Sequence, residues 1–242
     1  MERVEDIGFG NLKLIQDPGC FCYGIDAVIL ADYAHTYCPD ALKIVDLGTV
    51  NGIVPLILSH KNKKAGITGI EIQEEAADMA RRSCRINNLQ NRITIRTGDI
   101  IESETYSGLQ ADAVTCNPPY FVKGGGILNN RKPKYIARHE TTAVFDDFAR
   151  AASEILNTKG HFFIVHRPSR LVDIFWSCRK YRLEPKDIRF VAPKAGEVPN
   201  IVLVHCVAGG GRELKIDRTL YVHDENGCYT DEIETIYERE HK

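Results

Sequence analysis

Short apolar segments alternate with helix-forming segments along most of this chain, and this alternation limits the possible folds more than any other feature. We expect strands over 42–48, 67–72, 93–99, 111–120 and 160–166, and helices over 54–60, 74–89, 145–156 and 171–182. Such an order predicts a parallel sheet with right-handed crossovers. Two further strands, 187–193 and 199–207, are too close for a helix between them and should pair antiparallel. The pattern therefore predicts a doubly wound α/β fold, with seven strands and an antiparallel pair at the C-terminal end.

The composition is that of an ordinary globular protein, with 43% hydrophobic and 26% charged residues among 242. No apolar run approaches the ~20 residues of a membrane span, and the first residues lack a signal-peptide pattern, so we expect a cytoplasmic protein. The eight cysteines and eight histidines show no metal-ligand spacing. We expect reduced thiols and no metal. The net charge of −2 means that a nucleic-acid partner would need a local basic patch.

Polar residues close three successive predicted strands, at the edge of the sheet where such folds bind ligands. The turn DLGTVNG, residues 46–52, follows the first strand, Glu71 closes the second, and Asp99 closes the third. A Gly-rich turn lets backbone amides approach a ligand. A carboxylate at Glu71 can accept hydrogen bonds from both hydroxyls of a ribose, and Asp99 can meet an adenine amino group. Each feature alone is typical of an ordinary strand end, but together they predict a nucleoside site.

The spacing of glycines in the first turn indicates which nucleoside this is. A dinucleotide-binding enzyme usually has GxGxxG here, whereas this chain has Gly48-x-x-x-Gly52. The missing phosphate fingerprint favours a cofactor without pyrophosphate, such as S-adenosylmethionine.

The segment Asn117-Pro118-Pro119-Tyr120 follows the fourth predicted strand. The prolines stiffen the turn, which holds the Asn117 side chain and the Pro118 carbonyl at defined positions. An exocyclic amino nitrogen on a nucleobase is a weak nucleophile because its lone pair is delocalised into the ring. Two acceptors for its N–H groups would favour a tetrahedral nitrogen and direct the lone pair at a methyl group. Tyr120 can stack on the base, and Phe121 is either a second wall of the same pocket or part of the core.

Four motifs, in order DLGTVNGI, GIEIQEEA, TGDI and NPPYF, resemble the class I methyltransferases that act on amino groups. The start LKLIQ…FCYGIDAVILADYA and the later IARHE narrow the resemblance to the bacterial valine-tRNA adenine-N6 methyltransferase family, which modifies adenosine 37 beside the anticodon. The resemblance covers almost the whole chain and implies a Rossmann-like fold. NPPY itself also serves glutamine, rRNA guanine and DNA adenine methylation.

The resemblance also implies roles for individual residues. The cofactor would be bound by the side chains or backbone of Asp46, Gly48, Asn51, Glu71, Asp99, Asn117 and Tyr23, and the target base by Asn117, Pro118 and Tyr120. We expect one domain over 1–242, with a hairpin and an Asp26-capped helix in 1–40 covering the cofactor side and an extension over 212–242. One position departs from the family pattern DLGTGNG, because Val50 stands where a glycine is expected.

A basic segment directly follows NPPYF and is the predicted RNA-binding surface. It contains no acid and five cations, Lys123, Arg131, Lys132, Lys134 and Arg138, which suits contact with phosphates beside the target nucleotide. His166, Arg167, Arg170 and Lys194 could extend it. A solvated loop is an equally good interpretation for any one of these side chains.

Two other functions remain open from the sequence. One is the same chemistry on rRNA, DNA or a protein glutamine. The other is a catalytically silent RNA-binding or cofactor-sensing protein, which Val50 would permit and an intact NPPY motif disfavours.

Overall fold

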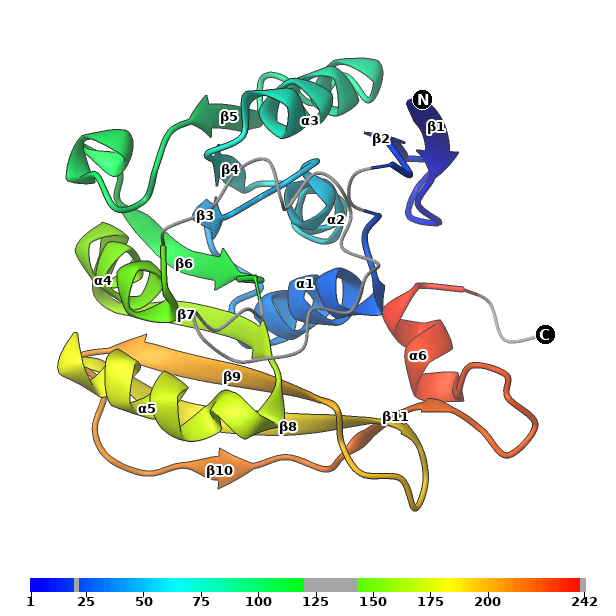
Figure 1. The fold of residues 1–242 in the computed structure, drawn as a ribbon, viewed down its shortest axis with the longest axis vertical. Coiled ribbons are helices and arrows are strands. Elements are labelled where there is room, and N and C mark those ends of the chain that lie inside the picture. Colours follow the sequence, from blue (N-terminus) through cyan, green and yellow to red (C-terminus); the bar gives the residue numbers. More distant parts are fainter. Residues whose placement is uncertain (20–21, 120–142, 240–242) are drawn as a thin grey trace.

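The computed structural model describes residues 1–19, 22–119 and 143–239. Its centre is a sheet in the order β10-β8-β9-β7-β6-β3-β4-β5, with β11 also paired to β8 (Figure 1). The strands are β3 (Lys43–Leu47), β4 (Gly66–Glu71), β5 (Ile93–Thr97), β6 (Ala111–Cys116), β7 (Leu156–His166), β8 (Leu183–Lys194), β9 (Ile201–Ala208), β10 (Lys215–Ile216) and β11 (Leu220–His223). A separate hairpin, β1 (Arg3–Asp6) with β2 (Lys13–Gln16), precedes them.

The predicted α/β class and the C-terminal strand pair are confirmed. β3 to β7 are parallel to their neighbours in this part of the sheet, and β9 runs antiparallel to both β7 and β8. The expected number of seven strands is too low for the described residues, because β10 and β11 add two short parallel strands to β8. Strands of two and four residues give almost no periodicity in the sequence, so the pattern could not reveal both.

Helices cover both faces of the sheet, as a doubly wound fold requires. The helices are α1 (Ile25–Tyr37), α2 (Ile53–Lys61), α3 (Glu74–Ile86), α4 (Phe145–Ile155), α5 (Leu171–Lys180) and α6 (Asp231–Ile236), with short 3₁₀ turns at Ser103–Tyr106 and Pro168–Arg170. Successive strand residues alternate between the two cores: Ile44 packs with α1 and α2, whereas Val45 packs with α4. This burial on both faces explains why the central strands are continuously apolar.

The start of α1 differs from the expectation that Asp26 caps it. The N-cap is Gly24, and Asp26 lies inside the first helical turn. A carboxylate is favourable there because the first turn carries the positive end of the helix dipole. Because Asp26 does not cap the helix, its side chain is able to extend to the predicted catalytic turn after β6.

The order of the strands determines where a ligand can bind. From β3 the chain moves through β4 to β5 on one side, and then crosses to β6 and β7 on the other. The direction reverses between β3 and β6, and open α/β sheets bind ligands beyond the carboxyl ends of the strands at such a point. The turn after β3 and the Asn117 turn after β6 flank this position.

The seven cysteines inside the described ranges are free thiols, and four of them, Cys84, Cys116, Cys178 and Cys206, are buried.

Among the helices in the described ranges, none is long and apolar enough to cross a bilayer.

Candidate active site

The turn between β3 and α2 is held against the end of β4 by backbone hydrogen bonds. Gly48 N and Thr49 N both donate to the Ile70 carbonyl, at 2.9 and 3.0 Å. The close approach requires glycine at Gly69, where a Cβ would lie 2.8 Å from the Thr49 side chain. The turn is therefore a preorganised structure, as expected for a surface that receives a ligand.

Val50 adopts the left-handed backbone conformation that the family pattern assigns to glycine. Its φ is +50°, between Gly48 at +72° and Gly52 at +83°. The substitution has therefore left a positive φ in place, and a β-branched residue in that region is strained.

Glu71 lies at the end of β4 and is 5% exposed. Its Oε2 accepts a hydrogen bond from Val50 N and its Oε1 accepts one from Gln73 N, each at 2.9 Å. Burial raises the pKa of Glu71, and the backbone donors oppose this rise. Each carboxylate oxygen has a second lone pair, so the group can accept two further hydrogen bonds from a diol.

Asp46 links β3 to β6 beneath the turn. Its Oδ1 accepts a hydrogen bond of 2.6 Å from the Thr115 hydroxyl, and the residue is 2% exposed. Burial raises its pKa to about 7, with the Thr115 bond opposing this and the nearby Glu71 charge adding to it. The residue that opens the DLGTVNG segment therefore carries a carboxyl group whose pKa lies near neutrality.

Asn51 is a buried residue of this turn whose side-chain amide could bind a polar ligand. It is 1% exposed, and neither its Oδ1 nor its Nδ2 has a hydrogen-bond partner among the residues that the structure describes. Buried amide groups are almost always satisfied. An unsatisfied amide beside the turn fits a ligand that carries both donors and acceptors, as an amino acid moiety does.

Asp99 follows β5 and is half-buried. Its Oδ1 accepts a hydrogen bond of 2.9 Å from Ile101 N, and its carbonyl accepts one of 2.7 Å from the Thr105 hydroxyl. These bonds fix the loop after β5 at the same edge as Glu71, which is where the sequence placed the adenine contact.

Asn117 directly follows β6 and is half-buried, with Pro118 buried behind it. Its Nδ2 donates to Asp26 Oδ2 at 3.4 Å. Asp26 comes from α1, 91 residues earlier in the chain, and sequence analysis missed this partner because only the tertiary fold brings the two together. The neighbouring Cys116 is buried, and its pKa is raised well above the usual range by burial. A thiol that stays protonated is a poor nucleophile. This agrees with the interpretation of NPPY as a motif that acts on an exocyclic amine, a reaction that requires no cysteine nucleophile.

Several predicted site residues lie outside the described residues. These are Tyr120, Phe121, Lys123, Arg131, Lys132, Lys134 and Arg138, so their predicted roles stay predictions.

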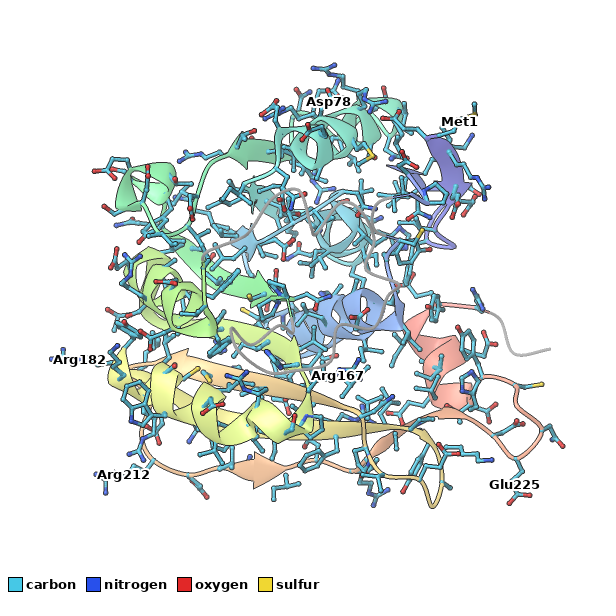
Figure 2. The ribbon with its side chains drawn as sticks, in the orientation of Figure 1. Met1, Asp78, Arg167, Arg182, Arg212 and Glu225 are labelled. Carbon is cyan, nitrogen blue, oxygen red and sulfur yellow. The ribbon has the colours of Figure 1, made fainter. Side chains whose placement is uncertain are left out.

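Other predicted residues can be placed. Tyr23 is half-buried just before α1, and burial and the Glu5 charge raise its pKa. Figure 2 shows Arg167 just beyond the end of β7, and Arg170 pairs with Asp173 at 2.7 Å. Lys194, at the end of β8, pairs with Glu197 at 3.6 Å.

The order of the sheet, the turn after β3 and the Asn-Pro-Pro turn after β6 together define a class I methyltransferase. Solved structures agree with this fold. A predicted O-methyltransferase from Agrobacterium tumefaciens has a TM-score of 0.69 at 23% identity, covering 88% of this chain and 95% of that one. The Thermus thermophilus 16S rRNA N2 G1207 methyltransferase has a TM-score of 0.60 at 16% identity, covering 86% and 50%.

The methyltransferase small domain family matches residues 11–173, and the chain belongs to this family. It is therefore an enzyme of the methyltransferase class, as the sequence motifs predicted. The similar curated proteins include several with the name tRNA1(Val) (adenine(37)-N6)-methyltransferase. The one from Porphyromonas gingivalis is 28% identical and covers 93% of this chain and 90% of its own. The one from Histophilus somni is 24% identical and covers 98% and 97%.

Proposed function

We propose that this enzyme transfers a methyl group from S-adenosylmethionine to the exocyclic amino group of an adenine in tRNA, at adenosine 37 of valine tRNA. The observation that carries the proposal is the Asn117 amide, placed by a rigid Pro-Pro turn at the point where the sheet reverses direction. The names of the relatives support the adenine and the tRNA, since they align with more than nine-tenths of this chain.

The cofactor fits the residues at the carboxyl ends of β3, β4 and β5. Asn51 and the backbone of the Gly48 turn would hold the methionine part, and Glu71 the ribose. Asp99 would meet the adenine. Asp46 supports the turn from below, and Tyr23 would cover the cofactor from the segment before α1. The bound cofactor supplies an electrophilic methyl group on its sulfonium centre.

The residues of the NPPY turn then act on the acceptor. Asn117 Oδ1 and the Pro118 carbonyl accept the two N–H groups of the target amine, which favours a tetrahedral nitrogen whose lone pair faces the methyl group. No base is needed before attack, because the nitrogen becomes acidic only once it carries the new methyl. Tyr120 and Phe121 would stack on the base and hold it in this position.

The RNA surface is proposed from the sequence. The five cations of the basic segment, between Lys123 and Arg138, would contact phosphates beside the target nucleotide. Arg167 and Arg170, beyond the end of β7, would extend that surface along the same edge of the sheet. A cytoplasmic location is part of this proposal, since tRNA is modified there.

The test is methyl transfer from labelled cofactor to total RNA from a strain that lacks this gene, followed by nucleoside analysis. We expect label in N6-methyladenosine and in the tRNA fraction. Asn117→Ala should abolish transfer while cofactor binding, measured by calorimetry with S-adenosylhomocysteine, stays nearly unchanged. Label in rRNA would replace the proposed acceptor, as would label in DNA or in a protein glutamine when DNA or protein is offered in place of RNA. Normal turnover by Asn117→Ala would overturn the mechanism.

A further inference from the structure

We propose that Asp26 is a positioning residue for the methyl transfer, because it sets which way the Asn117 amide faces. This rests on the proposed function only in that Asn117 contacts the acceptor amine. Nothing in the spacing of the two residues along the chain suggests the pairing, since it joins the first turn of α1 to the turn after β6.

The two oxygens of Asp26 bond to different partners. Oδ1 accepts a hydrogen bond of 3.1 Å from the backbone amide of Ala27, and Oδ2 accepts one of 3.4 Å from Asn117 Nδ2. The backbone bond restrains the carboxylate and directs its second oxygen toward the site. Gly24 makes room for this rotamer, because a Cβ there would lie 2.7 Å from Asp26 Oδ1.

The chemistry of the two groups makes the orientation one-sided. A primary amide has nearly the same shape when its oxygen and nitrogen are exchanged, so packing alone discriminates weakly between the two orientations. An ionised carboxylate can only accept hydrogen bonds. Asn117 must therefore present Nδ2 to Asp26, which turns Oδ1 away from it.

This orientation is the one that the reaction needs. The acceptor amine offers two N–H donors and requires acceptors, so an inverted amide would set donor against donor. The carboxylate also polarises the Asn117 amide and increases the negative charge on Oδ1, which strengthens its interaction with an amine that becomes positively charged as it is alkylated.

A merely structural role for Asp26 makes a different prediction. An acid in the first turn of α1 stabilises the helix through its dipole, and its loss would lower stability without acting through Asn117. Asp32 lies further along α1, beyond its first turn, and pairs with Lys61 at 3.0 Å. Asp32→Ala is therefore a matched control that removes one carboxylate from the same helix.

The kinetic test compares Asp26→Ala, Asp26→Asn and Asp32→Ala. We expect Asp26→Ala to lower kcat by on the order of 10- to 100-fold, the scale of a misplaced reacting group, with KM for RNA and affinity for S-adenosylhomocysteine within about twofold. The kcat of Asp26→Asn should lie between those of wild type and Asp26→Ala. The new amide can still accept the hydrogen bond from Asn117 Nδ2, but it can also donate one and so permits the inverted Asn117 amide. Asp32→Ala should keep wild-type kcat. In the Asn117→Ala background, Asp26→Ala should cause no further loss of any residual activity, since the two residues act through one interaction.

A second measurement does not depend on the acceptor. In the complex with S-adenosylhomocysteine, the Asn117 side-chain amide resonances should shift in Asp26→Ala and stay in place in Asp32→Ala. Unchanged Asn117 resonances, or wild-type kcat in Asp26→Ala, would overturn the positioning role. If the wild-type enzyme methylates no RNA although the resonances shift, the proposed function fails and the Asp26–Asn117 coupling stands.

Discussion

Val50 combines a left-handed backbone conformation with a hydrogen bond from its amide to Glu71, and both hold the turn after β3. The family pattern predicted glycine at this position, and the φ of +50° confirms that the turn needs a left-handed residue there. The motif did not predict that the amide of the same residue would donate to Glu71 Oε2. That hydrogen bond depends on how β3 and β4 lie side by side in the sheet. Motifs identify the residue types of this site, whereas their mutual contacts come from tertiary packing.

Val50→Gly should stabilise the protein and tighten cofactor binding. A strained left-handed valine costs roughly 1–3 kcal/mol, and glycine adds back roughly 0.5–1 kcal/mol of entropy cost on folding, so the expected gain in unfolding free energy is about 1 kcal/mol. Removal of the branched side chain from the turn should also increase affinity for S-adenosylmethionine several-fold. Denaturant titration and calorimetry test the two parts. Equal affinity would mean that the Val50 side chain points away from the ligand.

The sequence predicted which segments form strands and helices, but it located the ends of these segments less well. The helix expected over 74–89 ends at Ile86, and the strand expected from 160 begins at Leu156. The early start of β7 depends on pairing of Leu156 with Ala111 across a register shift. The pairing with β6 determines where β7 begins, and the local hydrophobic periodicity of the sequence does not indicate this pairing. The Asp46–Thr115 bond is likewise a contact between elements, and it offers a pH-dependent test.

Asp46→Asn should stabilise the protein at high pH and much less at low pH. The folded-state pKa of Asp46, about 7, lies above its ordinary value of 3.8. Its contribution to stability is therefore fully present below about pH 4 and is lost as the pH rises toward 7. Asparagine keeps an acceptor for Thr115 without the buried charge. At pH 8 we expect a gain on the order of 2–4 kcal/mol, measured by denaturant unfolding at pH 4 and pH 8, with the exposed Asp40→Asn as control. A gain independent of pH would contradict the charged state of Asp46.

The central sheet has an apolar core on each face, and the continuously hydrophobic strands predicted both cores. The sequence did not predict the polar groups that are buried within the sheet. His161 bonds to His205 at 2.8 Å, and His205 bonds to Asp187 at 2.9 Å, which joins β7, β9 and β8. Burial lowers the pKa of both histidines. His166, near the candidate site, behaves in the same way, so the fold as a whole contains imidazoles that resist protonation.

This property predicts that the contribution of His166 to stability falls as the pH is lowered from about 6.5 to about 4, opposite in sign to that of Asp46. His166 is 4% exposed, and burial, together with the charges of Arg170 and Arg167, lowers its pKa from 6.5 to about 4. Its Nδ1 accepts a hydrogen bond of 2.7 Å from Arg167 N, so this nitrogen must be unprotonated in the folded state. The unfolded chain binds a proton below pH 6.5 that the folded chain takes up only near pH 4, and the difference favours unfolding throughout that window.

His166→Asn supplies a neutral acceptor at the position of Nδ1, so the stability of this variant should decline less between pH 6.5 and pH 4. The variant should be less stable than wild type at pH 7.5, because the packing of the imidazole ring is lost. Unfolding free energies at half-unit steps from pH 7.5 to 4 measure the slope, with His223→Asn as the control for a half-buried ring on β11. Parallel curves for wild type and His166→Asn would show that His166 titrates normally in the folded protein.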